Sequence, residues 1–267
     1  MYARNLGLEW GDHTCILAAQ NGHLNTLKYA HEQGCPWNEN TCKVAAAAGH
    51  VNTLKFAHEH GCPWDEGTCE NASGFGQVDT LKYAHEQGCP WDENTCKFAA
   101  AHGHINTLKF AHEHGCPWNE GTCEMAAGMG HTNCLKYAHE QGCPWGLDTC
   151  KIAAANGQLN TLKYAHENGC PWDRGTCDMA AMSGQINTLR YAHENGCEWT
   201  ANTTELATLS GNLGVLQYAC QNGCPWNLDM STLKFLNATH TGMYRYAMVY
   251  YNRLMKKRMD ERKSTRK

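Results

Sequence analysis

The sequence has no apolar run long enough to cross a membrane, and its start does not resemble a secretion signal. A membrane-spanning helix needs about 20 consecutive apolar residues, and no such run occurs among the 267 residues. The opening segment, MYARNLGLEW, has no charged stretch followed by an apolar one. We therefore expect a protein that neither enters a membrane nor is secreted.

Catalytic signatures are absent as well. The chain has no G-x-S-x-G motif, no glycine-rich phosphate loop and no H-E-x-x-H motif. The recurrent Ala-His-Glu triplet lacks the second histidine, because the residue four positions after His31 is Cys35. Histidines, cysteines and glutamates recur at equivalent positions, whereas an active site needs different groups that converge once. We expect no enzymatic activity and no cofactor.

The cysteine pattern indicates the cellular compartment, and the charge indicates the class of partner. The 17 cysteines are an odd number and recur at fixed spacing, unlike the disulfide framework of a small secreted protein. We expect reduced thiols and a cytoplasmic or nuclear location. Residues 253–267 hold eight basic and two acidic side chains, so they contribute +6 and the rest of the chain −10 to the formal charge of −4. An acidic body argues against nucleic acid as the partner.

What the chain does have is an internal repeat of 27 residues. Tryptophan stands at positions 10, 37, 64, 91, 118, 145, 172, 199 and 226. A near-constant frame surrounds each one, for example LKYAHEQGCPWNENTCKVAA at residues 27–46. A fixed period of this length is the signature of a solenoid, in which each unit packs only against its neighbours. Function is therefore expected on a surface rather than in a single pocket.

Each repeat is predicted to be a helix–turn–helix unit. The alanine-rich segment after Thr41 favours a short helix with Thr41 as its cap and an end at Gly49. A second helix is predicted to follow Asn52 as its cap and to end at Gly61. Residues 62–64, CPW, then return the chain in an extended conformation, since a residue before proline avoids the helical region.

These residues resemble the ankyrin repeat. The pattern T-x-x-x-A-A-x-x-G-H-x-x-x-L-x-[YF]-x-x-x-x-G matches that repeat at Thr41, Ala45, Ala46, Gly49, His50, Leu54 and Gly61. The usual repeat has about 33 residues, and the segment from Gly61 to Thr68 is too short for the β-hairpin finger that such repeats project. Short repeats with the GCPW and TC pattern are similar to those in ankyrin-like proteins of giant DNA viruses and some protists.

The resemblance implies an all-α, ankyrin-like solenoid of about nine 27-residue repeats without long β-hairpin fingers, and an as yet unidentified protein partner. Residues 1–13 are predicted to be a partial repeat or cap, and residues 14–229 the repeat array. Residues 230–256 are predicted to be a degenerate capping repeat, since Ser231 replaces the frame cysteine. Residues 257–267 are expected to form a basic, flexible tail, and the protein is expected to be a monomer.

Two cysteines and a histidine recur in every unit from Cys15 to Cys197 and raise the question of zinc. Zinc prefers such ligands, and structural sites use four of them. Antiparallel helices would bring three together, but a fourth is missing and the spacing matches no compact zinc motif. The favoured prediction is metal-free packing in the core, with the histidine bonded to a loop carbonyl; a zinc-binding rod is the alternative. Its site residues would be Cys42, His58, Cys62, Cys69, His85, Cys89, Cys96, His112 and Cys116.

The residue that follows the first cysteine of the repeat alternates in charge. The series runs Lys43, Glu70, Lys97, Glu124, Lys151 and Asp178. We expect each of these residues to lie beside its opposite in the next repeat, as a structural ladder of ion pairs worth about 0–1 kcal/mol each.

Positions that vary between repeats are the candidates for binding. One of them holds Ala48, Phe75, His102, Met129, Asn156 and Ser183, and another holds Val44, Asn71, Phe98, Met125, Ile152 and Met179. Ankyrin-like proteins bind on a concave face lined by their first helices, so the resemblance places these positions at a groove. Methionine and aromatic side chains suit a protein partner. The predicted partner-binding residues are Phe75, His102, Met129, Phe98 and Met125, with filler at partly buried sites as the alternative reading.

Overall fold

The computed structural model describes residues 11–227 and 229–264. Within these residues there are eighteen α-helices and no strand. The helices follow one another as nine pairs, which confirms the all-α repeat architecture, and no β-hairpin finger occurs in this part of the chain. The predicted N-terminal partial repeat falls mainly on residues 1–10, which lie outside the described residues.

Each pair has a first and a second helix, joined by a tight turn. The first helices are α1 (Asp12–Gln20), α3 (Glu39–Ala47), α5 (Glu66–Gly74), α7 (Glu93–Ala101), α9 (Glu120–Gly128), α11 (Leu147–Ala155), α13 (Arg174–Met182), α15 (Ala201–Leu209) and α17 (Met230–Thr239). The second helices are α2 (Leu24–Glu32), α4 (Val51–Glu59), α6 (Val78–Glu86), α8 (Ile105–Glu113), α10 (Thr132–Glu140), α12 (Leu159–Glu167), α14 (Ile186–Glu194), α16 (Leu213–Gln221) and α18 (Thr241–Ser264).

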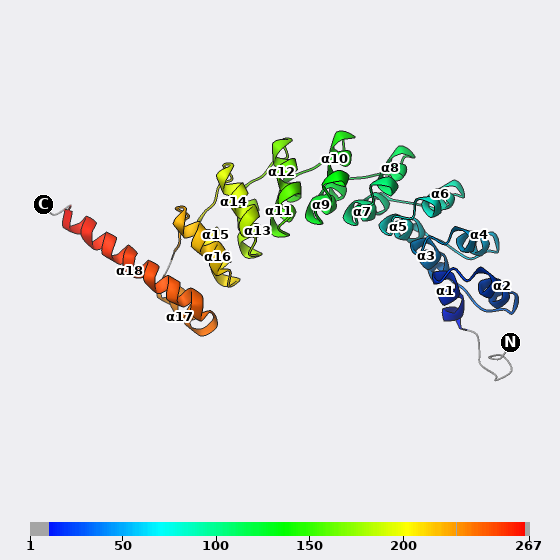
Figure 1. Cartoon of the computed structure of the whole chain (residues 1–267), viewed down its shortest axis with the longest axis horizontal. Helices are drawn as coiled ribbons and strands as arrows, with labels where there is room; N and C mark the ends of the chain where they lie inside the picture. The colour runs from blue at the N-terminus through cyan, green and yellow to red at the C-terminus, as the bar shows by residue number, and fades with distance from the viewer. Residues whose placement is uncertain (1–10, 228, 265–267) are drawn as a thin grey trace. The chain divides into compact units, whose positions relative to one another are not determined.

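The chain divides into two compact units. Unit 1 is Met1–Thr149 and unit 2 is Cys150–Lys267, with the boundary inside α11. In unit 1 the first helices α1, α3, α5, α7 and α9 pack side by side, and the second helices form a parallel row behind them. The first helices lie along the inner, concave side of this row in Figure 1.

The first helix of a repeat begins three residues earlier than the sequence suggested. Asn38 is the N-cap of α3, and its side-chain oxygen accepts a hydrogen bond from the backbone amide of Asn40 at 3.0 Å. Thr41, the predicted cap, is fully buried inside the helix. Asparagine and aspartate cap helices at least as well as threonine, and here the extended backbone of Asn38 decides the start.

The second helix also begins earlier than predicted. Its N-cap in the same repeat is His50, not Asn52. The reason is the tight turn at Gly49, where the Val51 amide bonds to the Gly49 carbonyl at 3.0 Å and leads the chain directly into the helix. The two predicted helix ends are confirmed, since Gly49 and Gly61 both take positive φ angles of 76° and 83°.

Small side chains form the core of each repeat. In α3, Cys42, Ala45 and Ala46 are fully buried, and in α4 so are Leu54 and Ala57. One leucine per repeat contributes about 2 kcal/mol of burial free energy. The cysteines and alanines contribute little volume, and so they allow neighbouring first helices to pack closely against one another.

The last pair departs from the frame. α17 begins at Met230, 29 residues after the start of α15 at Ala201, whereas the other first helices recur every 27 residues. Trp226 is 7% exposed and packs against Tyr250 of α18, with ring centroids 5.2 Å apart. α18 has 24 residues and continues to Ser264. The predicted start of the tail at residue 257 therefore lies inside this helix.

Gly103 and Gly115 provide a test of how closely neighbouring repeats pack at the turn. Both have positive φ, 75° and 84°, a conformation that costs an L-residue about 1–2 kcal/mol. A Cβ on Gly103 would also lie 2.5 Å from Nδ1 of His131 in the next repeat, whereas a Cβ on Gly115 would meet nothing within 4 Å. We predict that Gly115→Ala lowers the free energy of unfolding by about 1–2 kcal/mol and Gly103→Ala by about 1 kcal/mol more. Urea unfolding followed by circular dichroism measures both losses. Equal losses would show that the close approach of His131 to Gly103 adds no cost.

Candidate functional site

Each recurrent histidine stacks flat on the tryptophan of its own repeat. The ring centroids of His58 and Trp64 are 3.7 Å apart at an interplanar angle of 13°, and those of His112 and Trp118 are 3.8 Å apart at 11°. His58 is half-buried. The expectation of a core imidazole bonded to a loop carbonyl was therefore wrong, because the flat tryptophan ring holds it at the edge of the repeat.

An aromatic side chain of the next repeat closes this stack. The Tyr137 ring stands edge-on to Trp118, with centroids 6.2 Å apart, and the Tyr137 hydroxyl oxygen lies 2.9 Å from Nδ1 of His112. Lys109 Nζ lies 5.4 Å from the Tyr137 ring centroid, a cation–π contact. Equivalent contacts join His166, Trp172 and Tyr191 in unit 2. This aromatic ladder couples each repeat to its neighbour on the second-helix side.

The second cysteine of each repeat ties the end of one helix to the start of the other. Cys62 Sγ donates to the carbonyl of Asn38, the N-cap of α3, at 3.2 Å. The bond recurs from Cys116 to Asp92 at 3.2 Å and from Cys197 to Asp173 at 3.1 Å. It links residues 24 apart within one repeat.

The first cysteine lies beside the second, and both are buried. The hydrogen bond to the Cys62 thiol and burial raise the pKa of the Cys42 thiol, so it stays protonated at neutral pH. All 17 cysteines are free thiols. A protonated, buried thiol is a poor nucleophile.

The candidate zinc trios are not assembled as ligand sets. Within residues 11–227 and 229–264, no group of three or more histidine, cysteine, aspartate or glutamate side chains is placed to hold a metal ion. In the trio of Cys42, His58 and Cys62, the thiols face backbone carbonyls or each other, while the imidazole lies on Trp64. The same holds for the two further trios, which are Cys69, His85 and Cys89, and Cys96, His112 and Cys116.

The charge ladder differs from its prediction. Lys43 Nζ lies 2.7 Å from Asp65 Oδ2, and Lys151 Nζ lies 3.5 Å from Asp173 Oδ2. Asp65 and Asp173 are N-caps of the following first helices. The expected partner, Glu70, lies one turn further along α5 and does not form this ion pair. The lysine pairs with the cap carboxylate because this carboxylate stands at the start of the next first helix, within reach of the lysine on the preceding first helix.

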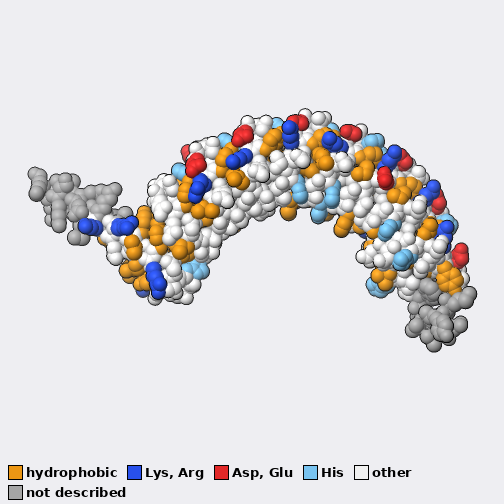
Figure 2. Space-filling model, in the orientation of Figure 1, with side chains coloured by type: hydrophobic (Ala, Val, Ile, Leu, Met, Phe, Trp, Pro, Cys, Tyr) orange, Lys and Arg blue, Asp and Glu red, His pale blue; other side chains and the backbone are white. Residues whose placement is uncertain are grey.

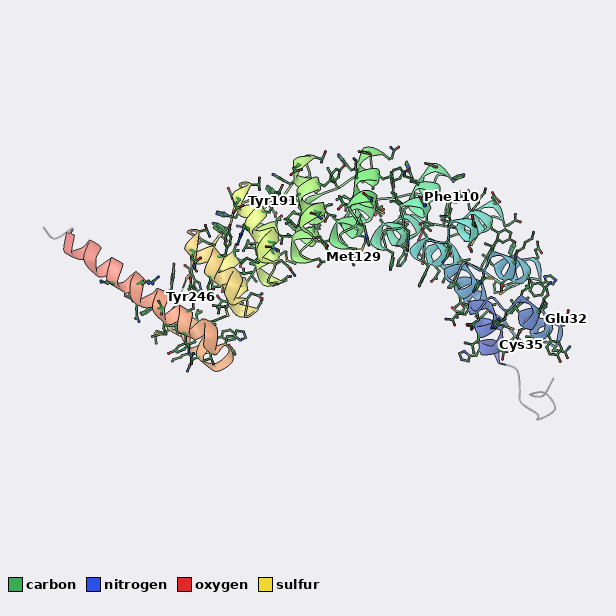
Figure 3. The ribbon with its side chains drawn as sticks, viewed as in Figure 1. Glu32, Cys35, Phe110, Met129, Tyr191 and Tyr246 are labelled. Atoms are coloured by element: carbon green, nitrogen blue, oxygen red, sulfur yellow. The ribbon has the colours of Figure 1, made fainter. Side chains whose placement is uncertain are left out.

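The predicted binding residues gather on one surface of unit 1. Phe75 is 61% exposed, Met129 51% and Phe98 41%; His102 is exposed and Met125 half-buried. Figure 3 shows Met129 on the side of the first helices, away from Phe110 on α8. We call this the first-helix surface, defined by Leu17, Val44, Ala48, Asn71, Phe75, Phe98, His102, Met125 and Met129.

The sequence reasoning missed Leu17, which is 56% exposed. It stands one period before Val44, so the repeat frame itself was the signal. A hollow of about 470 Å³ lies on the same surface, and its lining includes Gln20 of α1, Val44 and Ala47 of α3, and Phe75. Ala47 and Ala48 at the end of α3 add only short side chains to this lining, where larger residues would fill the hollow.

The opposite surface is uniform from repeat to repeat. Lys55 and Glu59 lie 3.8 Å apart on α4, and Lys136 and Glu140 lie 3.8 Å apart on α10. Figure 2 shows basic and acidic side chains side by side along the second helices, with hydrophobic ones between them. Such exposed pairs contribute about 0.3–0.5 kcal/mol each and differ little between repeats.

Comparison with solved structures identifies the fold. The crystal structure of the human ASB11 ankyrin repeat domain matches with a TM-score of 0.50 and 19% sequence identity, over 59% of this chain and 84% of that chain. The chain has an ankyrin-repeat fold. No protein-family model and no curated protein sequence matches it, and the similarity to repeats of giant DNA viruses and protists stays a prediction. None of the described helices is long and apolar enough to span a bilayer.

Within the ankyrin-repeat fold, the aromatic ladder supplies contacts between neighbouring repeats. Typical ankyrin repeats join their helix pairs through a β-hairpin finger, as the resemblance implies. Here residues 62–64 and their equivalents make the connection, and the stack of histidine, tryptophan and tyrosine supplies contacts between repeats. A repeat of 27 residues therefore keeps neighbouring pairs in register without a strand.

Two histidines have a pKa that their surroundings lower. Burial and the nearby His114 lower the pKa of His85, and burial and His102 lower the pKa of His104. A histidine whose folded pKa lies below its unfolded value stabilises the fold above the unfolded pKa, and this contribution is lost as the pH falls through the folded pKa.

We therefore predict that the urea midpoint falls as the pH is lowered from about 7.5 to about 5.5. The variant H85Q/H104Q should show a shallower fall than the original protein. Equal slopes for the two proteins would show that these two histidines are not responsible.

A metal-removal experiment tests the zinc alternative. The stacked histidines and carbonyl-bonded thiols predict that a chelator leaves helix content and the urea midpoint unchanged, because no metal-binding free energy is coupled to folding. Circular dichroism before and after chelation, with elemental analysis of protein purified without added metal, measures this. Close to one zinc per repeat, together with loss of helix on chelation, would establish the metal-stabilised rod instead.

Proposed function

We propose that this protein is a non-enzymatic interaction scaffold that holds a protein partner on the first-helix surface of unit 1. The observation that carries the proposal is the row of exposed Phe75, Phe98 and Met129 on three successive first helices. Isolated exposed apolar residues are ordinary, but a contiguous group on one surface is typical of an interaction site.

The distribution of variable residues supports this surface over the opposite one. In unit 1 each second helix from α2 to α10 carries an exposed lysine and, four residues later, an exposed glutamate. The first-helix surface changes at each step, from Ala48 to Phe75, His102 and Met129. A surface that is the same in every repeat distinguishes partners poorly, whereas a changing one offers a specific sequence of contacts.

The scaffold also suits binding because its backbone is already fixed. Leu54 and Ala57 are fully buried, and the exposed Phe75 and Met129 are the C-cap residues of α5 and α9. Side chains presented from an ordered framework lose less conformational entropy on association than those on a mobile loop. Less of the binding free energy is then lost to ordering the scaffold.

The cellular compartment and the oligomeric state are part of the same proposal. Sixteen of the 17 free cysteines are buried and Cys220 is half-buried, which suits a reducing compartment such as the cytoplasm or nucleus. We propose a monomer in which each chain offers one such surface.

The test compares two triple variants. Binders are selected from a displayed library of protein fragments with the full chain as target, and their affinities are measured by isothermal titration. F75A/H102A/M129A should weaken binding by about 30-fold or more, since truncating a central contact costs about 1–2 kcal/mol or more. E59A/E86A/E113A, on the second helices, should leave it unchanged. Binders that ignore the first variant and respond to the second would place the interaction on the opposite surface.

A further inference from the structure

The first-helix surface of unit 1 is hollowed by small residues. The frame position of Ala47 holds Gly74, Ala101 and Gly128 in the following repeats of this unit, and Gln20 in α1. Phe98 lies directly over one of them, because a Cβ on Gly74 would meet Phe98 Cβ at 3.4 Å. In unit 2 the same frame position holds Ala155, Met182 and Leu209, and the last two are 40% and 55% exposed. Helices α3 to α9 of unit 1 thus present small residues beside aromatic and methionine side chains, whereas α13 and α15 of unit 2 present protruding ones.

The same helices carry a strong excess of negative charge. The first helices α1 to α9, with the caps Asp65 and Asp92, hold nine carboxylates and two lysines, a formal charge of −7. The second helices α2 to α10 hold six carboxylates and five lysines, a formal charge of −1. The acidity of unit 1 is therefore concentrated on the side of the exposed phenylalanines and methionine.

Nearby lysines offset only part of this charge. Burial and the neighbouring Asp92 raise the pKa of Glu70, which the Asn94 side chain and Lys43 offset only in part. Burial, Glu120 and Asp148 raise the pKa of Glu124, and Lys97 offsets this only in part. These two carboxylates are held beside others of the same sign, and a cation placed there would relieve the repulsion.

Acidic and apolar groups lie along the same short helices. Glu70 stands in the middle of α5 and Phe75 is its C-cap. Five residues of helix separate them by about 7.5 Å along the axis, which is less than the diameter of about 10 Å of a helix with side chains. One amphipathic segment lying across the first helices is therefore wide enough to span this axial distance.

We infer that the occupant of this surface is a basic amphipathic segment of a partner protein. Its apolar side chains pack against Phe75, Phe98 and Met129, and its lysines or arginines face Glu70 and Glu124. The inference rests on the proposed function and adds the chemistry of the partner. An acidic peptide, a nucleic acid or an anionic lipid surface would each add negative charge to an already repulsive surface.

The experiment selects from a random library of displayed 16-residue peptides with the full chain as target. Enriched peptides should combine lysine or arginine with apolar residues, and their affinity should fall steeply as salt rises from about 0.05 M to about 0.5 M. E70Q/E124Q should weaken binding by about 10-fold and flatten this salt dependence. The charge-matched control E86Q/E140Q, on α6 and α10, should change neither.

Both pairs of substitutions should leave the fold intact, which circular dichroism and thermal unfolding check, because glutamine removes charge without removing volume. Peptides that need Phe75 and Met129 but are neutral, acidic or unaffected by E70Q/E124Q would overturn the basic partner and leave the proposed function standing. Peptides that bind F75A/M129A as tightly as the original protein would overturn both. Failure to enrich any peptide would also count against the inference, while the fragment selection would still decide the proposed function.

Discussion

The close packing of small side chains between neighbouring first helices is the constraint on which this structure depends. Cys42, Ala45 and Ala46 are fully buried, and the same residue types recur at these positions along the array. Their small volume brings successive helices close together, and this in turn demands glycine at the turn where a neighbouring histidine, glutamine or asparagine lies over the backbone. A larger core residue would separate the helices and break the contacts on both surfaces of the array.

Two sets of contacts use this close approach on the second-helix side. The thiol of Cys62 bonds to the carbonyl of Asn38 and fastens the two helices of one repeat. The stack of His112 and Trp118 meets Tyr137 of the following repeat and fastens one repeat to the next. Residue types that often carry chemistry thus serve packing here. Their number reflects the number of repeats, because each repeat places its thiols and its imidazole in the same packing contacts.

The exposed positions on the first-helix side take no part in these contacts, which leaves them available for the proposed binding. Phe75 and Met129 are exposed, whereas the core residues of the same helices are buried, so these two residues can change without disturbing the core. Unit 1 combines this freedom with a hollow and a concentration of carboxylates. The proposed partner, with complementary charge and an apolar face, is a narrower choice than the general ability of a repeat protein to bind proteins.

The sequence by itself determined the period, the helix pairs and the helix ends at Gly49 and Gly61, because all three follow from local spacing and backbone preference. The repeat frame put Phe75 and Met129 at one equivalent position and Phe98 at another, and the ankyrin resemblance predicted that such positions lie at the groove of the first helices. Only the tertiary structure decided that Asn38 caps α3, that His58 lies on Trp64, and that Lys43 pairs with Asp65 rather than Glu70. These outcomes depend on distances between side chains in the folded repeat or across to the next one, and a one-dimensional pattern does not contain those distances.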